Sequence, residues 1–207
     1  MTGTSRTFVL GISGASGASY AMRLLDLLLA DGYKVHLVAT DFGRRLLADE
    51  LNISRADFDG FLPHLPLVQT SSLLDQIRTN LICHPHKDVG AVIASGSFLH
   101  DGMVVLPLSS QSLGAIASGA GSNLLVRAAH VTLKERRPLI LCHREMPLNL
   151  IDIENMRTLA LAGAIMCSPN PGFYLKPQRI EDIIDFVVGK VLDLLKVPHT
   201  LAIRWQG

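Results

Sequence analysis

The stretch from residue 8 to residue 20 constrains the fold most, because it has the pattern of a buried strand, a small-residue loop and a helix start. Phe8 to Ile12 is apolar or small throughout, and the apolar periodicity from Tyr20 to Ala30 indicates the helix. The loop between them, Ser13-Gly14-Ala15-Ser16-Gly17, lets a ligand approach backbone N–H groups closely. A helix that begins after such a loop favours a phosphate. The GxxGxxG spacing matches neither the dinucleotide fingerprint nor the P-loop, so a tight turn without a ligand is the alternative.

Apolar runs alternate with helical patterns along the rest of the chain. Strands are expected at residues 34–40, 103–108, 138–142 and 164–168, and helices at 41–51, 71–77, 109–117, 123–137, 150–162 and 180–195. Residues 52–69 look irregular, and residues 78–90 give no clear pattern. Short apolar strands between helices predict an α/β fold, a parallel sheet covered on both faces. No repeat or linker divides the chain, so residues 1–207 are expected to form one domain.

Composition narrows the classes of function. The 207 residues carry a formal net charge of +1, which gives no basic field for nucleic acid. Charged residues make up 18% and hydrophobic residues 48%, and we interpret this shortage of charge as buried subunit interfaces of a homo-oligomer. The three cysteines are widely spaced, and no metal-ligand pattern is visible. Neither a membrane span nor a signal sequence is visible, so we expect a cytoplasmic protein.

Polar groups follow several predicted strands. Thr40 ends the second strand, Ser109-Ser110-Gln111-Ser112 follows the 103–108 strand, Arg144 and Glu145 follow the 138–142 strand, and Tyr174 follows the last. Carboxyl ends of parallel strands share one edge, where ligands bind at the switch point of the strand order. A hydroxyl at residue 40, where a dinucleotide site has an acidic residue, favours a mononucleotide such as FMN over NAD. Serines at a helix start are also ordinary capping residues, which is the alternative for Ser109 and Ser112.

Six separated motifs then carry a family resemblance. They are Gly11 to Ala18, Ala94 to Phe98, Leu133 to Leu139, Arg144 to Leu148, Pro171 to Tyr174 and Arg204 to Gly207. Together they cover nearly the whole chain in order, and the sequence resembles the flavin prenyltransferases of the UbiX type, formerly described as aromatic acid decarboxylases.

The resemblance implies a Rossmann-like, three-layer flavoprotein fold and a homo-oligomer, typically a dodecamer. The family transfers a dimethylallyl group from dimethylallyl monophosphate to N5 and C6 of reduced FMN without a metal. Its product, prenylated FMN, serves a partner decarboxylase, in many bacteria in ubiquinone synthesis.

The resemblance also implies roles for individual residues. Those expected to hold FMN are Gly14, Ala15, Ser16, Thr40, Ser109, Ser110, Gln111, Ser112 and Arg144. Those expected to hold the prenyl phosphate are Lys134, Arg144, Tyr174 and Lys190. Ser16, Glu50, Glu145 and Lys134 are expected at the reacting centre, which Trp205 would help to enclose. Three fixed cations would stabilise the departing phosphate, so no metal is required.

Four positions depart from the family pattern in three ways. Leu106 and Leu108 stand where the family commonly has cysteine, and Thr40 stands where serine is frequent. Lys190 replaces a frequent arginine, which exchanges a bidentate fork for a point charge. Two other functions remain open: an FMN-dependent decarboxylase of the same fold, and a non-catalytic flavin-binding protein. The cation cluster favours the prenyltransferase, because a decarboxylase has no phosphate leaving group.

Overall fold

The computed structural model describes residues 6–203. Its six strands form one sheet in the order β3-β2-β1-β4-β5-β6, and all five pairings are parallel. The strands are β1 (Thr7–Ile12), β2 (Lys34–Ala39), β3 (Leu81–His84), β4 (Met103–Leu108), β5 (Leu139–His143) and β6 (Ile165–Met166). This is the strand order of the Rossmann fold, and it reverses between β1 and β4. The predicted Rossmann-like α/β class is therefore confirmed.

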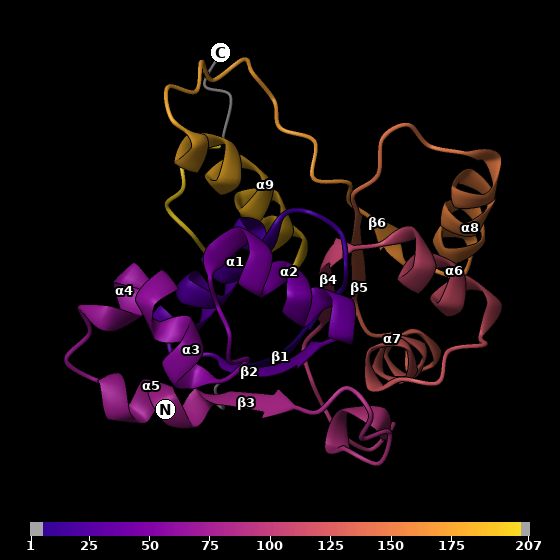
Figure 1. Ribbon diagram of the computed structural model, residues 1–207, viewed down its shortest axis with the longest axis horizontal. Helices are drawn as coiled ribbons and strands as arrows, with labels where there is room; N and C mark the ends of the chain where they lie inside the picture. Colours follow the sequence, from indigo (N-terminus) through magenta and orange to yellow (C-terminus); the bar gives the residue numbers. More distant parts are fainter. Residues whose placement is uncertain (1–5, 204–207) are drawn as a thin grey trace.

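Helices cover both faces of the sheet, with α1 and α9 on one side and α6, α7 and α8 on the other (Figure 1). The long helices are α1 (Ala18–Ala30), α2 (Asp41–Leu51), α6 (Ser110–Ser118), α7 (Leu124–Lys134), α8 (Leu150–Leu161) and α9 (Ile180–Leu194). The short ones are α3 (Phe58–Phe61), α4 (Pro66–Gln69), α5 (Leu74–Asn80) and the 3-10 turns η1 (Leu62–His64) and η2 (Val92–Ala94). None of the helices within residues 6–203 has both the length and the apolar character needed to cross a bilayer.

Burial on both faces explains the continuous apolar runs of the strands. All six residues of β4 are buried, and alternate side chains enter different cores. Val104 and Leu106 pack in the core under α1 and α9, whereas Val105 and Leu108 pack in the core under α6 and α7. A strand that serves two cores needs apolar residues at every position, which is why it lacks the alternation of a half-exposed strand.

The sequence patterns were least informative between residues 52 and 90. The stretch without a clear pattern contains β3, whose four residues are too few to show a period. The stretch expected to be irregular contains α3, η1 and α4, each a single turn. The helix expected at 71–77 begins three residues later, at Leu74. Tertiary packing of isolated apolar residues such as Phe61 and Val68, both fully buried, stabilises these turns.

A histidine cluster lies between β2, β3 and the loop before β4. His36 Nδ1 is 2.9 Å from His84 Nε2, and the ring centroid of His36 lies 4.7 Å from that of Phe98. Phe98 in turn stacks on His100 with 6.0 Å between centroids. Burial, together with the charges of His84 and Lys34, lowers the pKa of His36 to about 4. Burial also lowers the pKa values of His84 and His100.

These shifts predict acid sensitivity. Because the folded-state pKa lies below the unfolded value of 6.5, the unfolded chain binds more protons once the pH falls below about 6.5. We expect the free energy of unfolding to decrease as the pH is lowered from 7.5 to 5, and His36 to contribute about 1–2 kcal/mol of that decrease. Urea unfolding of the wild type and of His36→Phe at both pH values measures this. An equal pH dependence in the two proteins would contradict the assignment to His36.

Candidate functional site

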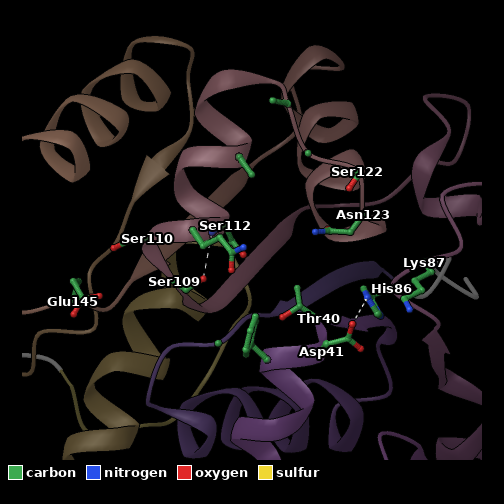
Figure 2. Close-up of a pocket in the computed structure, with 16 residues that line it drawn as sticks. Thr40, Asp41, His86, Lys87, Ser109, Ser110, Ser112, Ser122, Asn123 and Glu145 are labelled. Atoms are coloured by element: carbon green, nitrogen blue, oxygen red, sulfur yellow. Dashed lines mark hydrogen bonds and ion pairs between the residues drawn. The ribbon is translucent and has the colours of Figure 1, made fainter.

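A cleft of about 680 Å³ opens at the carboxyl edge of the sheet, where the strand order reverses. Sixteen residues line this switch-point cleft: Gly14, Thr40, Asp41, Phe42, His86, Lys87, Ser109, Ser110, Gln111, Ser112, Ala115, Ala120, Gly121, Ser122, Asn123 and Glu145. They come from the ends of β1, β2, β3, β4 and β5 and from the starts of α2, α6 and α7. Figure 2 shows the serines at the start of α6 facing Thr40 and Asp41 across the cleft.

The start of α6 provides one wall. Ser109 caps the helix, and its Oγ accepts a hydrogen bond of 3.3 Å from the backbone N–H of Ser112. The backbone N–H of Ser109 donates to Ser13 Oγ at 2.8 Å, and Ser13 Oγ donates to the carbonyl of Pro107 at 3.1 Å. These bonds fix the helix start against β1. The helix N-terminus therefore presents its partial positive charge to the cleft, which suits an anion.

The opposite wall is the start of α2. Thr40 caps this helix, because its Oγ1 accepts a hydrogen bond of 3.0 Å from the backbone N–H of Gly43. Asp41 pairs with His86 at 3.0 Å and with Arg44 at 2.5 Å. The hydrogen bond from Arg44, with smaller contributions from the charge of His86, lowers the pKa of Asp41. Asp41 is therefore ionised and already paired at neutral pH.

The start of α1 does not provide the predicted phosphate site. The carboxylate of Glu50 accepts hydrogen bonds from the backbone N–H of Gly17 at 3.1 Å and of Ala18 at 2.8 Å. These are the donors that a phosphate would need, and a side chain 32 residues away in sequence already satisfies them. Residue 17 must be glycine because its φ of 127° is a conformation that other residues rarely adopt. Residue 14 must be glycine because a side chain there would collide with Phe42. Glu50 therefore occupies the helix start, and phosphate binding by the rest of the loop, Ser13 to Ser16, stays a prediction.

The loop after β1 still lies at the site. Arg144 Nε donates a hydrogen bond of 3.2 Å to the carbonyl of Ser16. Gly14 lines the switch-point cleft, Ala15 is buried, and Ser16 is exposed. Arg144 and Glu50 thus hold the same short loop from two directions, and the structure brings this predicted group together at one edge of the sheet.

A second cavity of about 660 Å³ lies beyond the carboxyl end of β6, against α9. Its lining residues are Met166, Cys167, Ser168, Asn170, Tyr174, Phe186, Val187, Lys190, Asp193 and Ile203. Two of the predicted phosphate ligands, Tyr174 and Lys190, lie here. The Tyr174 ring packs edge-on against Phe186 with 5.7 Å between centroids. We call this space the β6 cavity. Glu145, in the loop after the neighbouring strand β5, lines the switch-point cleft and not the β6 cavity.

A pair of cysteines lies beside the β6 cavity. Cys142 on β5 is fully buried and Cys167 is partly exposed. A hydrogen bond from Cys142 and the charge of Lys190 lower the pKa of Cys167, while burial opposes them. Lys190 therefore contributes positive potential to this cavity although its own side chain is half exposed.

Lys134 lies elsewhere. It is the last residue of α7, which leads into β5, so it lies at the amino edge of the sheet. There its Nζ pairs with Glu135 and lies against Gly96. The five residues of β5 separate it from Arg144, a span of roughly 16 Å. The three predicted cations do not form one cluster within a single chain, and Trp205 lies outside the described residues.

The flavoprotein family model matches residues 2–192. A flavin prenyltransferase UbiX of Halalkalibacterium halodurans is 42% identical, with 99% of this chain and 96% of the relative covered. One from Synechocystis is 41% identical, with 98% and 97% covered. The chain belongs to the flavin prenyltransferase family.

Solved structures of the family have the same fold. The structure of AnUbiX (PadA1), a complex with FMN and dimethylallyl pyrophosphate, matches with a TM-score of 0.85 and 34% identity over 99% of both chains. A dodecameric FMN-dependent UbiX-like decarboxylase from Escherichia coli O157:H7 matches with a TM-score of 0.83 and 35% identity over 97% of this chain and all of that one.

The fold shows where the residues that depart from the family pattern lie. Leu106 and Leu108, at the positions where the family commonly has cysteine, are fully buried and enter the two cores, so neither lines the cleft. Thr40 keeps a hydroxyl at the cleft, where it also caps α2. Among the described residues, no three His, Cys, Asp or Glu side chains are grouped so that they could bind a metal ion.

The sequence patterns missed His86 and Lys87, both of which line the cleft. They follow β3, the strand that was not recognised. The short apolar run Leu81-Ile82-Cys83 before Pro85 was the available signal. Recognised as a strand, it would have placed both residues at the carboxyl edge with the rest of the site.

Proposed function

We propose that this chain transfers a dimethylallyl group from dimethylallyl monophosphate to N5 and C6 of reduced FMN. Family membership over the whole chain carries the proposal. The geometry supports it, because the switch-point cleft follows the carboxyl ends of β1 to β5 and the β6 cavity adjoins the residues that follow β6, the neighbour of β5 in the sheet. A flavin and a prenyl phosphate need such neighbouring sites if their reacting atoms are to meet.

In this proposal FMN binds in the switch-point cleft. Its phosphate lies against the helix start at Ser109–Ser112, which offers N–H groups without intrahelical partners. The flavin ring lies toward Gly14, Ala15 and Ser16. Thr40 borders the cleft from the other side.

The prenyl phosphate binds in the β6 cavity. Lys190 and Arg144 supply positive charge and Tyr174 supplies a hydroxyl. As the allylic carbon–oxygen bond breaks, negative charge grows on the phosphate oxygens, and fixed cations stabilise that charge. Glu145, which lines the cleft, handles the proton that leaves the flavin during ring closure. Glu50 acts on the reacting centre through the loop that it holds.

Lys134 serves this site only from another subunit, because within its own chain it lies at the opposite edge of the sheet. A homo-oligomer, proposed to be a dodecamer like the Escherichia coli relative, provides such a subunit. Exposed apolar side chains support subunit contacts: Leu150 and Ile151 at the start of α8 and Leu161 at its end are each at least 70% exposed in the single chain.

The test is anaerobic incubation of the enzyme with reduced FMN and dimethylallyl monophosphate or diphosphate, followed by mass spectrometry of the flavin. We expect a product heavier by one dimethylallyl group. If the enzyme binds FMN but the flavin mass is unchanged with either donor, the chain is a flavin-binding protein without prenyltransferase activity. Release of carbon dioxide from an aromatic acid without a prenyl donor would instead favour the decarboxylase.

Delivery of prenylated FMN to a partner decarboxylase, a cytoplasmic location and a single domain over residues 1–207 also remain proposals. Co-expression with a prenyl-FMN-dependent decarboxylase tests the delivery. We expect the decarboxylase to be active only when this chain is present.

A further inference from the structure

Two of the three cysteines lie opposite each other on neighbouring strands, and no step proposed above uses them. Strands β5 and β6 pair in parallel, with Leu141 opposite Met166. The backbone N–H of Cys167 donates to the carbonyl of Leu141 at 3.0 Å, so the ladder continues past the last residue of β6. Cys142 and Cys167 are therefore the next opposite pair along the two strands.

Both thiols lie on the same face of the sheet. Cys142 is fully buried in the core under α1 and α9, and Cys167 packs against that same core. Neighbouring strands of a sheet lie about 4.8 Å apart. A disulfide joins cysteines whose Cα atoms are about 4.4–6.8 Å apart. The strand pairing thus places Cys142 and Cys167 within reach of a disulfide, although both are free thiols in this structure.

The third cysteine is excluded as a partner within the chain. Cys83 lies on β3, and the strand order puts four strand spacings, roughly 19 Å, between β3 and β5. Cysteines so far apart cannot be bridged without rearrangement of the sheet. Burial, together with the charge of Asp57, raises the pKa of Cys83 to about 12, so this thiol stays protonated at neutral pH. Cys83 therefore serves as an internal reference for an unreactive thiol.

The two paired thiols differ in their access to solvent. Cys167 lines the β6 cavity and is partly exposed, whereas Cys142 has no exposed surface. Together with the hydrogen bond from Cys142, the charge of Lys190 on α9 lowers the pKa of Cys167 against the effect of burial. Asp193, the acidic residue of this cavity, pairs with His199 at 3.2 Å and lies 4.0 Å from Lys190. An accessible thiol beside a cation is the one that an oxidant meets first.

We propose that Cys167 and Cys142 form a reversible redox site, which hydrogen peroxide oxidises to a disulfide with Cys167 as the attacking thiol and Cys142 as the resolving thiol. The site is independent of the proposed prenyl transfer. Its separation into one accessible and one buried thiol is the arrangement of a sensor cysteine next to its resolving cysteine.

The reaction has two steps. The Cys167 thiolate attacks one peroxide oxygen: an S–O bond forms, the O–O bond breaks, and the leaving hydroxide takes up the proton that Cys167 released, which gives a sulfenic acid and water. The Cys142 sulfur then attacks the sulfur of the sulfenic acid: the S–S bond forms, the S–O bond breaks, and the hydroxide leaves with the Cys142 thiol proton as a second water. The two thiols lose two electrons, which reduce one peroxide to two waters.

Mass spectrometry of the whole chain tests the proposal, after treatment with hydrogen peroxide and alkylation of the remaining free thiols. We expect the wild type to lose two hydrogen atoms, to yield peptides joined through Cys142 and Cys167, and to keep an alkylated Cys83. Dithiothreitol should then restore three alkylated thiols. In Cys142→Ala the resolving thiol is missing, so Cys167 should stop at the sulfenic acid, which dimedone traps. Cys83→Ser is the control and should form the same disulfide as the wild type.

Lys190→Met tests the part played by the cavity, because it keeps the length of the side chain and removes the ammonium. We expect its disulfide to form roughly 3–10-fold more slowly at pH 7, since loss of the cation lowers the thiolate fraction of Cys167. Lys34→Met, at the amino edge of the sheet, should react at the wild-type rate.

The wild-type measurement decides the proposal whether or not the variants fold. Three free thiols after peroxide treatment that fully oxidises a reference dithiol would overturn it. So would a disulfide that contains Cys83, or a Cys167 that is oxidised to the sulfinic acid without a bridge to Cys142. Equal rates in the wild type and in folded Lys190→Met would overturn the role of Lys190 in activating Cys167.

Discussion

The variant Glu145→Gln is expected to bind reduced FMN as the wild type does and to lose roughly 10²–10⁴-fold in prenylation rate. Glu145 lines the switch-point cleft, follows Arg144 directly, and is the carboxylate of the loop after β5. A proton must leave the flavin as the second bond forms, and a glutamine of the same shape cannot accept it. Single-turnover measurement at saturating FMN and prenyl donor isolates this step from binding.

Glu154→Gln is the matched control. Glu154 is an exposed carboxylate on α8 that pairs with Arg157 at 3.8 Å, so its loss should leave the rate unchanged. A fully active Glu145→Gln enzyme would exclude this carboxylate as the proton acceptor. The leaving phosphate, which also carries basic oxygens, would then be the remaining candidate.

The variant Lys134→Ala distinguishes two roles of Lys134: a cation that only stabilises the end of α7, and a ligand of the prenyl phosphate. As a cation in the last turn of α7, it contributes only about 0.3–1 kcal/mol to stability, and Lys134→Ala should leave turnover nearly untouched. As a ligand of the prenyl phosphate, it stabilises the leaving group, and we expect turnover to fall by roughly 10²–10³-fold. FMN affinity should change little in either case. Lys34→Ala, which removes another exposed lysine at the amino edge, is the control.

The position of Lys134 allows a sharper test of the same role. Because Lys134 and Glu145 lie at opposite edges of one chain, a site that uses both must take them from two subunits. Mixed oligomers of Lys134→Ala and Glu145→Gln should then regain part of the activity, since some sites receive an intact residue from each parent. Two inactive variants that stay inactive after subunit exchange would contradict a shared site. Full activity of folded Lys134→Ala would exclude Lys134 from the chemistry altogether.

The sequence predicted the long elements well because their burial follows a local period. The run that became β4 is apolar at every position, since the strand contacts a core on each face, and the helix at 41–51 ends as expected at Leu51. The alternation of strands and helices also determined which loops share the carboxyl edge. That order already places Lys134 at the other edge, because a helix that leads into a parallel strand ends where the strand begins.

The tertiary structure decided the partners of individual polar groups. The N–H groups at the start of α1 had the pattern of a phosphate site, but Glu50 reaches them from α2. Likewise Ser110 and His143 meet only because β4 and β5 are neighbours in the sheet. Hydrogen bonds and charge pairs act over a few ångströms in space and have no period along the chain. Local residue patterns therefore determined the fold class and the edge that carries the site, whereas long-range packing determined which donors at that edge are free for a ligand.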